Sequence, residues 1–228
     1  MGRGQRFLVP LPRVFEDREN WNSGVRMLSE FKADLQRYRE LRVSTREIAL
    51  NPAVWAIFWH RFGHWTYKED SPRILRPILK IIYILGALYF EALQQMRLDC
   101  SATIGPGLHI AHNGGIVLHP DTVIGKRCNM GHQVTIGTPG IGRHGVPQIG
   151  NGVYVGTGSV LIGGIRIGDG ARIAANSLVN RDVPAGATVM GVPAQIVKMG
   201  PQAVLETTAQ EAEPEAEPAD QCDPRGAR

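Results

Sequence analysis

Five of the seven histidines of this chain lie between positions 109 and 144, at His109, His112, His119, His132 and His144. Imidazole titrates near neutral pH, so histidine is the usual general base for removing a proton from a hydroxyl group. Three histidines could instead bind zinc if the fold brought them together, but these form no compact ligand motif. The pattern favours acid–base chemistry, and no metal is expected. For His109 and His119 a solvent-facing position without a catalytic role is the simpler interpretation.

These histidines lie within a six-residue repeat that extends from Ile104 to Val183. A small aliphatic residue, often followed by glycine, recurs at Ile104, Ile110, Leu118, Ile124, Met130, Ile136, Ile149, Val155, Leu161, Ile167, Ile173 and Val179. The spacing slips by two residues before Leu118. So short a repeat predicts a β-helix, in which each coil stacks on the one before. One aliphatic side chain per repeat would fill the core, while glycine and asparagine would form the corners.

One long interruption breaks the repeat, between Gly137 and Gln148. This segment is longer than two repeats, so we expect it to leave the coil as a protruding loop. Long loops on rigid scaffolds often carry functional residues.

The residues before the coil have a helical pattern and are assigned to an α-helical domain at positions 21–97. Apolar residues keep a spacing of three or four from Trp21 to about Arg42. Ser44 and Glu47 then fit a capping box, which predicts a second helix. A third helix should follow Asn51, because proline is favoured in the first turn.

The most apolar segment extends from Ile74 to Leu93. A membrane span needs about 20 nearly uncharged residues, and this segment contains Arg76, Lys80 and Glu91. We therefore expect a buried helix, packed in a bundle or at a subunit interface, and membrane contact is not expected.

The remaining boundaries follow from composition. Residues 1–20 show no steady period and are expected to be flexible. The coil domain is placed at 98–200; a short closing helix is expected after Pro184 and Gly191. Residues 201–228 are rich in Glu, Ala and Pro, and we expect a disordered acidic tail because such a sequence buries too little apolar surface to fold.

Charge and cysteine content bound the environment of the protein. The net charge is +4, but seven acidic residues and two arginines follow position 205, so the rest of the chain carries about +9. A basic body suits a polyanionic ligand such as a nucleotide cofactor, although an ordinary solvated surface is an equally simple interpretation. Three cysteines (Cys100, Cys128 and Cys222) and the absence of a signal-peptide pattern favour a cytoplasmic protein with reduced thiols.

The repeat and the preceding helices together resemble a known family. The hexapeptide pattern is similar to that of the left-handed β-helix acyltransferases. The segments that most resemble serine O-acetyltransferases are Asn51-Pro-Ala, Arg61-Phe-Gly-His-Trp65, Ile104–Gly125, Val134–Gly137, Arg143-His144 and Gly191-Val-Pro-Ala194. The implied fold is mixed α+β: a helical region followed by a left-handed parallel β-helix.

The resemblance implies a set of catalytic and substrate-binding residues. His112 matches the family's catalytic base, which takes the proton of the acceptor hydroxyl before that oxygen attacks acetyl-CoA. Asp99 matches the carboxylate that orients the base, as in a hydrolase triad. Arg143 and His144 match the pair that contacts the amino acid substrate, and Asn51 falls at a further substrate position.

The resemblance also implies the co-substrate and the assembly. Acetyl-CoA would lie between adjacent coils along Gly137, Thr157 and Gly158, although these residues could equally be coil corners. The family's site uses two neighbouring subunits, so a homotrimer or a dimer of trimers is expected. Nucleic acid is not an expected partner. The chain ends Gly226-Ala-Arg228 rather than in isoleucine, so a stable complex with the cysteine-forming partner enzyme is not expected either.

Two departures from the family leave the acceptor open. Asn51 and Ala111 replace carboxylates that the family uses around the substrate amino group, and an amine without a counter-charge binds poorly. L-Serine is the leading acceptor, and the alternative is a sugar or another small hydroxyl compound. Two further classes are a zinc hydratase on the same coil and a non-catalytic scaffold that binds no CoA.

Overall fold

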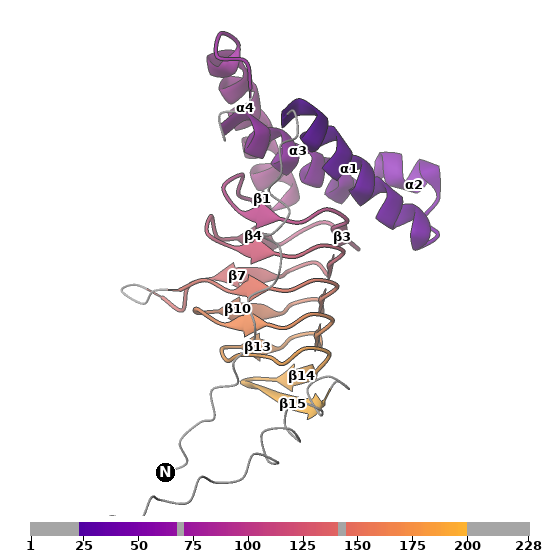
Figure 1. The fold of residues 1–228 in the computed structure, drawn as a ribbon, viewed down its shortest axis with the longest axis vertical. Helices are drawn as coiled ribbons and strands as arrows, with labels where there is room; N and C mark the ends of the chain where they lie inside the picture. The colour runs from indigo at the N-terminus through magenta and orange to yellow at the C-terminus, as the bar shows by residue number, and fades with distance from the viewer. Residues whose placement is uncertain (1–22, 68–70, 141–144, 200–228) are drawn as a thin grey trace, which may run out of the picture.

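The structure, a computed structural model, describes residues 23–67, 71–140 and 145–199. It contains a helical region at one end of a coil of short strands (Figure 1). The helices are α1 (Ser23–Glu40), α2 (Thr45–Leu50), α3 (Pro52–Tyr67) and α4 (Arg76–Gln94). Residues 1–20 and 201–228, which are expected to be flexible and disordered, lie outside the described residues.

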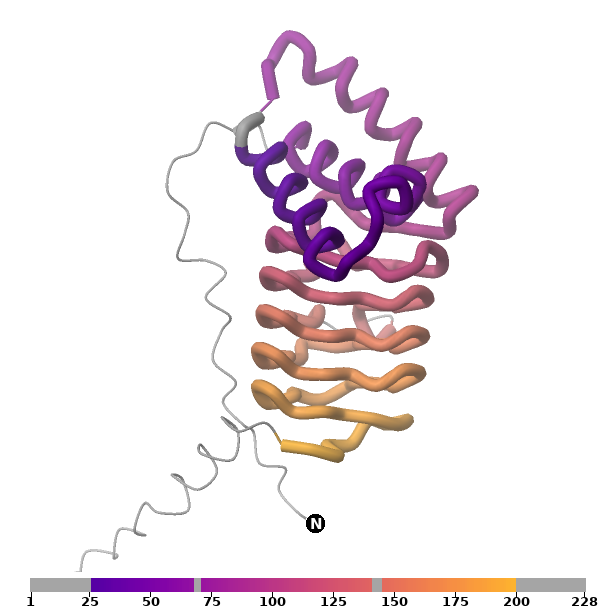
Figure 2. Tube along the Cα trace, turned by 90° about the vertical axis from the view of Figure 1, so that its right-hand side faces the viewer, coloured from indigo at the N-terminus to yellow at the C-terminus, as the bar shows by residue number. Residues whose placement is uncertain are grey.

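The coil is a parallel β-helix with three sheets, and its coils stack in sequence order (Figure 2). The first sheet contains β1 (Met96–Leu98), β4 (Ile116–Leu118), β7 (Thr135–Gly137), β10 (Val160–Ile162) and β13 (Leu178–Val179). The second contains β2 (Thr103–Ile104), β5 (Val123–Ile124), β8 (Gln148–Ile149) and β11 (Arg166–Ile167). The third contains β3 (His109–Ile110), β6 (Asn129–Met130), β9 (Tyr154–Val155), β12 (Arg172–Ile173), β14 (Thr188–Gly191) and β15 (Ala194–Lys198).

The repeating aliphatic residues form the core of the coil, as the sequence predicts. Residues from Ile104 to Val179 at the repeat positions are all buried. Equivalent residues of successive coils pair directly, as Leu118 does with Ile136 and Ile136 with Leu161. Each inward side chain therefore packs against its counterparts in the coils above and below.

Glycine follows many of these aliphatic residues because the corners stack too closely for a side chain. A Cβ added to Gly125 would lie 2.5 Å from the backbone of Gly150, and one added to Gly105 would lie 2.7 Å from the backbone of Gly125. Close backbone stacking is the reason for these glycines, which explains a recurring feature of the repeat.

The helical elements begin close to the predicted residues. Ser44 caps α2: its hydroxyl accepts a hydrogen bond from the Glu47 amide, and the Glu47 carboxylate accepts one from the Ser44 amide. This confirms the capping box. The helix expected after Asn51 is α3, which begins at Pro52.

A buried ion pair joins the helical region to the first coil. The Arg61 guanidinium on α3 lies 3.2 Å from the Asp34 carboxylate on α1, and both side chains are nearly inaccessible to solvent. Arg61 also donates to the carbonyls of Ile104 and Gly105, while Asp34 accepts from the amides of Gly107 and Leu108 at 2.8 and 2.9 Å. The pair thus satisfies backbone groups at a corner of the coil.

The expected closing helix is wrong: the coil ends in a β-hairpin. β14 pairs in parallel with β12 and antiparallel with β15. Gly191, at φ +105°, lies where the chain reverses. A hairpin gives the outer edge of β14 backbone partners, which a helix at this position would not supply.

The segment from Ile74 to Leu93, expected as a buried helix packed in a bundle or at a subunit interface, is helical but is mostly not buried within the single chain. The segment forms α4, but Tyr83 is its one buried residue. Most of its large apolar side chains face outward, including Leu85 and Leu93 at 64% and 67% exposure. By length and composition α4 is the one helix among the described residues that could cross a membrane.

The stability of the protein should depend on the buried Asp34–Arg61 pair. Arg61→Met should lower the free energy of unfolding by about 3–5 kcal/mol at pH 8, because it leaves a buried carboxylate without its counter-charge. Burial raises the pKa of Asp34, and Arg61 opposes that rise. Without Arg61 the pKa rises further, so the loss should shrink as pH falls and Asp34 becomes protonated.

Urea unfolding at pH 8 and pH 5 measures both effects. Adding Asp34→Asn to Arg61→Met should recover part of the loss, because the amide oxygen can still accept from the coil. Arg127→Met is the matched control, since it breaks an ion pair with Glu40 on the exposed surface. A loss in Arg61→Met no larger than in this control would contradict the assigned role.

Candidate active site

His112 lies in a two-residue insertion at the corner between β3 and β4. The Ala111 amide donates to the Met130 carbonyl, and the Gln133 amide donates to the Gly114 carbonyl, so the two coils pair on both sides of the insertion. His112 and Asn113 have no counterpart in the next coil and both are exposed. The two-residue slip in the sequence is therefore the point at which this histidine projects from the coil.

The same corner carries His132 and Thr157 in the next two coils. The carbonyl of His132 accepts from Gly158 and that of Thr157 from Asn176, which places these residues in one column with Gly114. The imidazole centroids of His112 and His132 are 5.8 Å apart. Nδ1 of His132 is buried and has no hydrogen-bond partner among the described residues. The imidazole of His132, with its buried Nδ1, thus lies in the coil next to the projecting His112 imidazole.

Asp99 does not lie near His112 in a single chain. Leu98 pairs with Leu118, so Asp99 occupies the corner after the first sheet, level with His119 in the next coil. His112 precedes β4, at the opposite end of the same sheet. The Asp99 carboxylate accepts a hydrogen bond from the Ser101 amide at 2.8 Å. One chain therefore does not assemble the catalytic pair that the resemblance implies.

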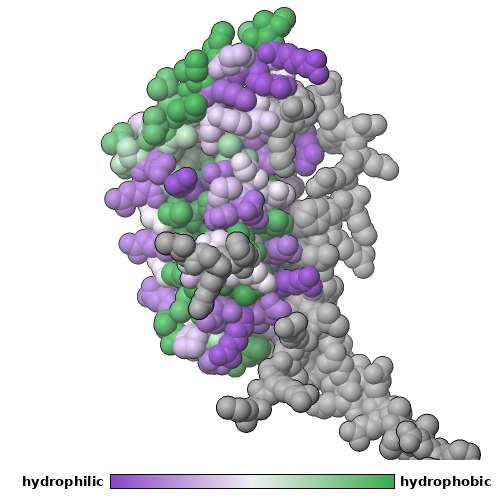
Figure 3. Space-filling view, turned by 90° about the vertical axis from the view of Figure 1, so that its left-hand side faces the viewer, coloured by the Kyte–Doolittle hydropathy of each residue, from purple (hydrophilic) through white to green (hydrophobic). Residues whose placement is uncertain are grey.

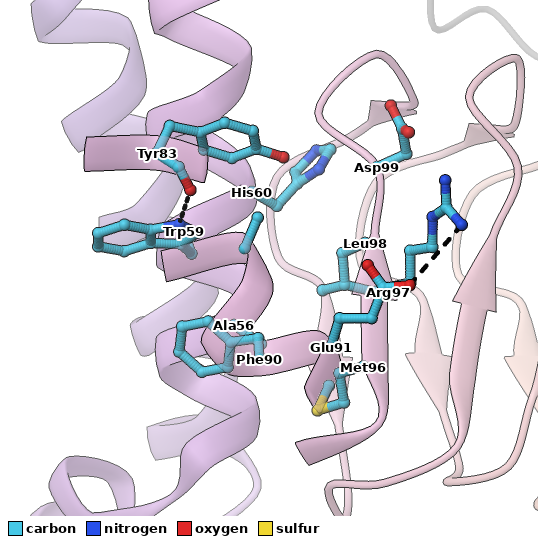
Figure 4. A pocket seen from close by; sticks show the side chains of 11 residues that line it. Ala56, Trp59, His60, Tyr83, Phe90, Glu91, Met96, Arg97, Leu98 and Asp99 are labelled. Atoms are coloured by element: carbon cyan, nitrogen blue, oxygen red, sulfur yellow. Dashed lines mark hydrogen bonds and ion pairs between the residues drawn. The ribbon is translucent and has the colours of Figure 1, made fainter. Parts of the chain in front are cut away.

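The turn that carries Asp99 borders a cavity of about 180 Å³ between α3, α4 and β1 (Figure 4). His60 and Tyr83 line the helical side of this cavity. Burial holds the pKa of His60 well below its usual range, against the opposing effect of the Leu98 and Asp99 backbone. These two residues were not identified from the sequence, because neither belongs to the repeat.

The predicted cofactor residues fall on two corners. Thr157 and Gly158 belong to the corner below His112, whereas Gly137 ends β7 on the corner that also carries Asp99. Gly158 has φ +73°, and a Cβ there would lie 2.1 Å from the Asn176 amide oxygen. Stacking of the corner thus accounts for Gly158 without a ligand, and its cofactor role stays a prediction.

Of the predicted substrate residues, the structure describes Asn51 alone. Arg143 and His144 lie outside the described residues. Asn51 caps α3, since its side-chain oxygen accepts from the Ala53 amide at 2.9 Å. Ala111 is exposed beside His112, at a position where the resemblance implies a carboxylate.

The other histidines of the coil differ from the expectation in one case. His119 lies at a corner, with Nδ1 accepting from the Asp121 amide at 3.2 Å. His109 is not at a solvent-facing corner: its ring packs edge-on against Tyr38 with centroids 4.6 Å apart. Burial, together with the charges of Arg37 and His112, lowers the pKa of His109 to about 4. Within the described ranges, no group of three or more His, Cys, Asp or Glu side chains could hold a metal ion.

Comparison with known proteins agrees with this architecture. A family model described as bacterial transferase hexapeptide (six repeats) matches residues 147–181. The stacked coils and this match indicate a hexapeptide-repeat transferase.

The relatives narrow this class. The serine acetyltransferase of Synechococcus elongatus is 30% identical over 75% of this chain and 67% of its own length. The Neisseria gonorrhoeae serine acetyltransferase solved in complex with serine has a TM-score of 0.64 and 31% identity, covering 77% of this chain and 70% of that one. A serine acetyltransferase solved in complex with CoA has a TM-score of 0.65 and 27% identity, covering 77% and 71%. The chain belongs to the serine acetyltransferase family of acetyl-CoA-dependent acyltransferases, which confirms the resemblance.

The environment of His109 should make the stability of the protein depend on pH. An unfolded histidine has a pKa near 6.5 and binds a proton more readily than the folded His109 does. The stability that the neutral ring contributes is therefore complete above about pH 6.5 and is lost as pH falls toward 4. His109→Gln should show a smaller decrease in melting temperature between pH 7 and pH 4.5 than the unmodified protein. Equal decreases would show that His109 does not contribute.

Proposed function

We propose that this protein transfers the acetyl group of acetyl-CoA to the hydroxyl of L-serine, forming O-acetyl-L-serine for cysteine biosynthesis, in the cytoplasm. The observation that carries the proposal is the exposed His112, projected by an insertion from the coil of a serine acetyltransferase family member. Relatives of similar fold bind CoA and serine, which supports the same pair of substrates here.

The proposed reaction needs one proton carrier. His112 removes the hydroxyl proton of serine as the oxygen attacks the thioester carbonyl of acetyl-CoA. When the tetrahedral intermediate collapses, the carbon–sulfur bond breaks and the imidazolium returns the proton to the CoA sulfur. The products are the acetyl ester and free CoA, and His112 is again neutral.

A second subunit would complete the site. His112 and Thr157 lie at one end of the first sheet, while Asp99 and Gly137 lie at the other. In a ring of three parallel coils whose first sheets face the three-fold axis, one end of each sheet would lie beside the opposite end of the neighbour's sheet. A homotrimer would thereby bring Asp99 of one subunit to His112 of the next. The carboxylate would hold the imidazole orientation and stabilise its protonated form.

The corner below His112 suits the pantetheine arm of CoA. The successive coils place Gly131, Gly156 and Ala174 at the equivalent of Ala111. A Cβ on Gly131 or Gly156 would lie 2.5 Å from Thr157 or Ala175 of the next coil, so stacking already requires these two glycines, and they leave the corner without protruding side chains. The half-buried Thr157 would border the arm and provide a hydroxyl for hydrogen bonding.

His112→Ala should lower kcat for serine acetylation by about 10²–10⁴-fold, the range expected for loss of a general base. Asp99→Asn should lower kcat less. A thiol-release assay measures both, and an unchanged kcat in His112→Ala would contradict the mechanism. The oligomer should remain intact in both variants.

Subunit mixing tests the shared site. Each variant alone should be less active than the unmodified protein, and co-refolded His112→Ala and Asp99→Asn subunits should be more active than either variant alone. Some of their interfaces would combine an intact His112 with an intact Asp99. The double variant mixed with the unmodified protein is the control for dilution. In that mixture His112 and Asp99 can pair only between two unmodified subunits, so the double variant adds no active interface. No recovery in the mixture would show that the pair does not form across subunits.

A sugar or another small hydroxyl compound is the second candidate acceptor. Ala111 offers no charge beside His112, and the Asn51 oxygen is already used to cap α3. The amino group of serine would therefore lack the two carboxylates that the family supplies. A neutral acceptor needs no such counter-charge.

A panel of acceptors assayed by thiol release separates the two candidates. Activity on L-serine that exceeds that on saccharides supports the first, and the reverse order supports the second. If serine binds with its amino group near Ala111, Ala111→Asp should lower the KM for serine by about tenfold, since a charge-assisted hydrogen bond contributes about 1.5–3 kcal/mol. O-Methylserine, which has no free hydroxyl, is the negative control.

A further inference from the structure

One face of α4 forms a continuous apolar surface at the helical end of the molecule. Its large exposed side chains are Ile78, Ile81, Ile82, Ile84, Leu85, Leu88, Tyr89 and Leu93. At 3.6 residues per turn they cover about half of the helix circumference. Hydrophobic side chains gather over this end of the molecule in Figure 3, whereas the coil below has a mixed surface. A patch of this size marks an interaction surface.

The opposite face of α4 is fixed to α3. The Trp59 indole donates to the Tyr83 carbonyl at 2.9 Å, and a Cβ on Gly86 would lie 2.0 Å from the Trp59 ring. A Cβ on Gly63 of α3 would lie 2.2 Å from the Tyr83 ring. Because α4 is packed along one side, it cannot pass through a bilayer surrounded by lipid. Contact with a membrane would have to be parallel to its surface.

Basic side chains accompany the apolar face. Between residues 71 and 97 the chain carries Arg73, Arg76, Lys80 and Arg97 but a single acidic residue, Glu91. Glu91 lies 3.8 Å from Arg97, which offsets its charge. Lys80 borders the apolar arc, and Arg73 is exposed in the turn before the helix. An apolar face beside basic side chains is the pattern of a helix that lies in the interface of an anionic membrane.

We propose that α4 docks the protein on the surface of an anionic lipid bilayer, with its apolar face in the headgroup region. The expectation of no membrane contact depended on the charged residues of this segment, which argue against a span. A helix that lies along the surface can keep those charges at the headgroups, and the apolar face of α4 is exposed in the chain. Charge complementarity favours lipid over a second copy of the chain. Two copies facing each other would bring their basic residues together, whereas anionic headgroups attract them. The inference is independent of the acceptor and of the proposed catalytic residues.

Co-sedimentation with vesicles tests the proposal. The purified full chain should bind vesicles of phosphatidylcholine mixed with phosphatidylglycerol, and should bind phosphatidylcholine alone much more weakly. Replacing Arg73 and Lys80 by glutamine should weaken binding to the anionic vesicles by about fivefold for each charge. Equal binding to both kinds of vesicle would contradict the electrostatic part of the proposal.

A matched pair of double variants tests the surface itself. Ile81→Glu with Leu85→Glu places two charges on the apolar face and should abolish vesicle binding. Met190→Glu with Val197→Glu places two charges on comparably exposed apolar positions of the closing hairpin and should leave binding intact. All four positions are exposed, so both variants should keep the circular dichroism and melting temperature of the unmodified protein.

Light scattering after size exclusion separates lipid from a second copy as the occupant. If the face is a membrane surface, the Ile81→Glu, Leu85→Glu variant keeps the oligomeric mass of the unmodified protein. A halved mass without vesicle binding by the unmodified protein would overturn the proposal and assign the face to contact between oligomers. Absence of vesicle binding with unchanged mass would also overturn it.

Discussion

Stacking of each coil on the next is the constraint on which the rest of this structure depends. Backbone hydrogen bonds pair equivalent residues of successive coils, so every position of the repeat becomes a column along the molecule. Residues in the inward columns must be aliphatic, and residues in the corner columns must be small or tolerate a positive φ. A residue projects from the coil only where the pairing is interrupted, and His112 lies at such a point.

The helical region depends on a different interaction. The buried Asp34–Arg61 pair makes hydrogen bonds to backbone groups at one corner of the first coil. Those groups would otherwise need water as their hydrogen-bond partner. Tyr38 adds to this contact, donating to the Ile110 carbonyl and accepting from its amide. The first coil is thereby held by helices on one side, which positions α4 beside it with its apolar face outward.

Columns also explain why a single chain does not bring His112 and Asp99 together. His112 and Asp99 belong to corners at opposite ends of one sheet, and no rearrangement of side chains joins them while the coils stay stacked. Symmetric assembly of parallel coils would join such corners across each interface. Under the proposed mechanism, the rigid coil would therefore make the chemistry depend on the assembly.

The sequence by itself determined the β-helix, the identity of its inward residues, the capping box at Ser44 and the projection of His112, because each is a local or periodic property. Tertiary structure alone decided the rest. Closure by a hairpin follows from the need to pair the edge of β14, and exposure of α4 follows from which face packs on α3. The separation of Asp99 from His112 and the half-burial of His109 depend on where distant residues lie in the stack. Periodicity identifies a face of an element, but it does not specify what that face meets.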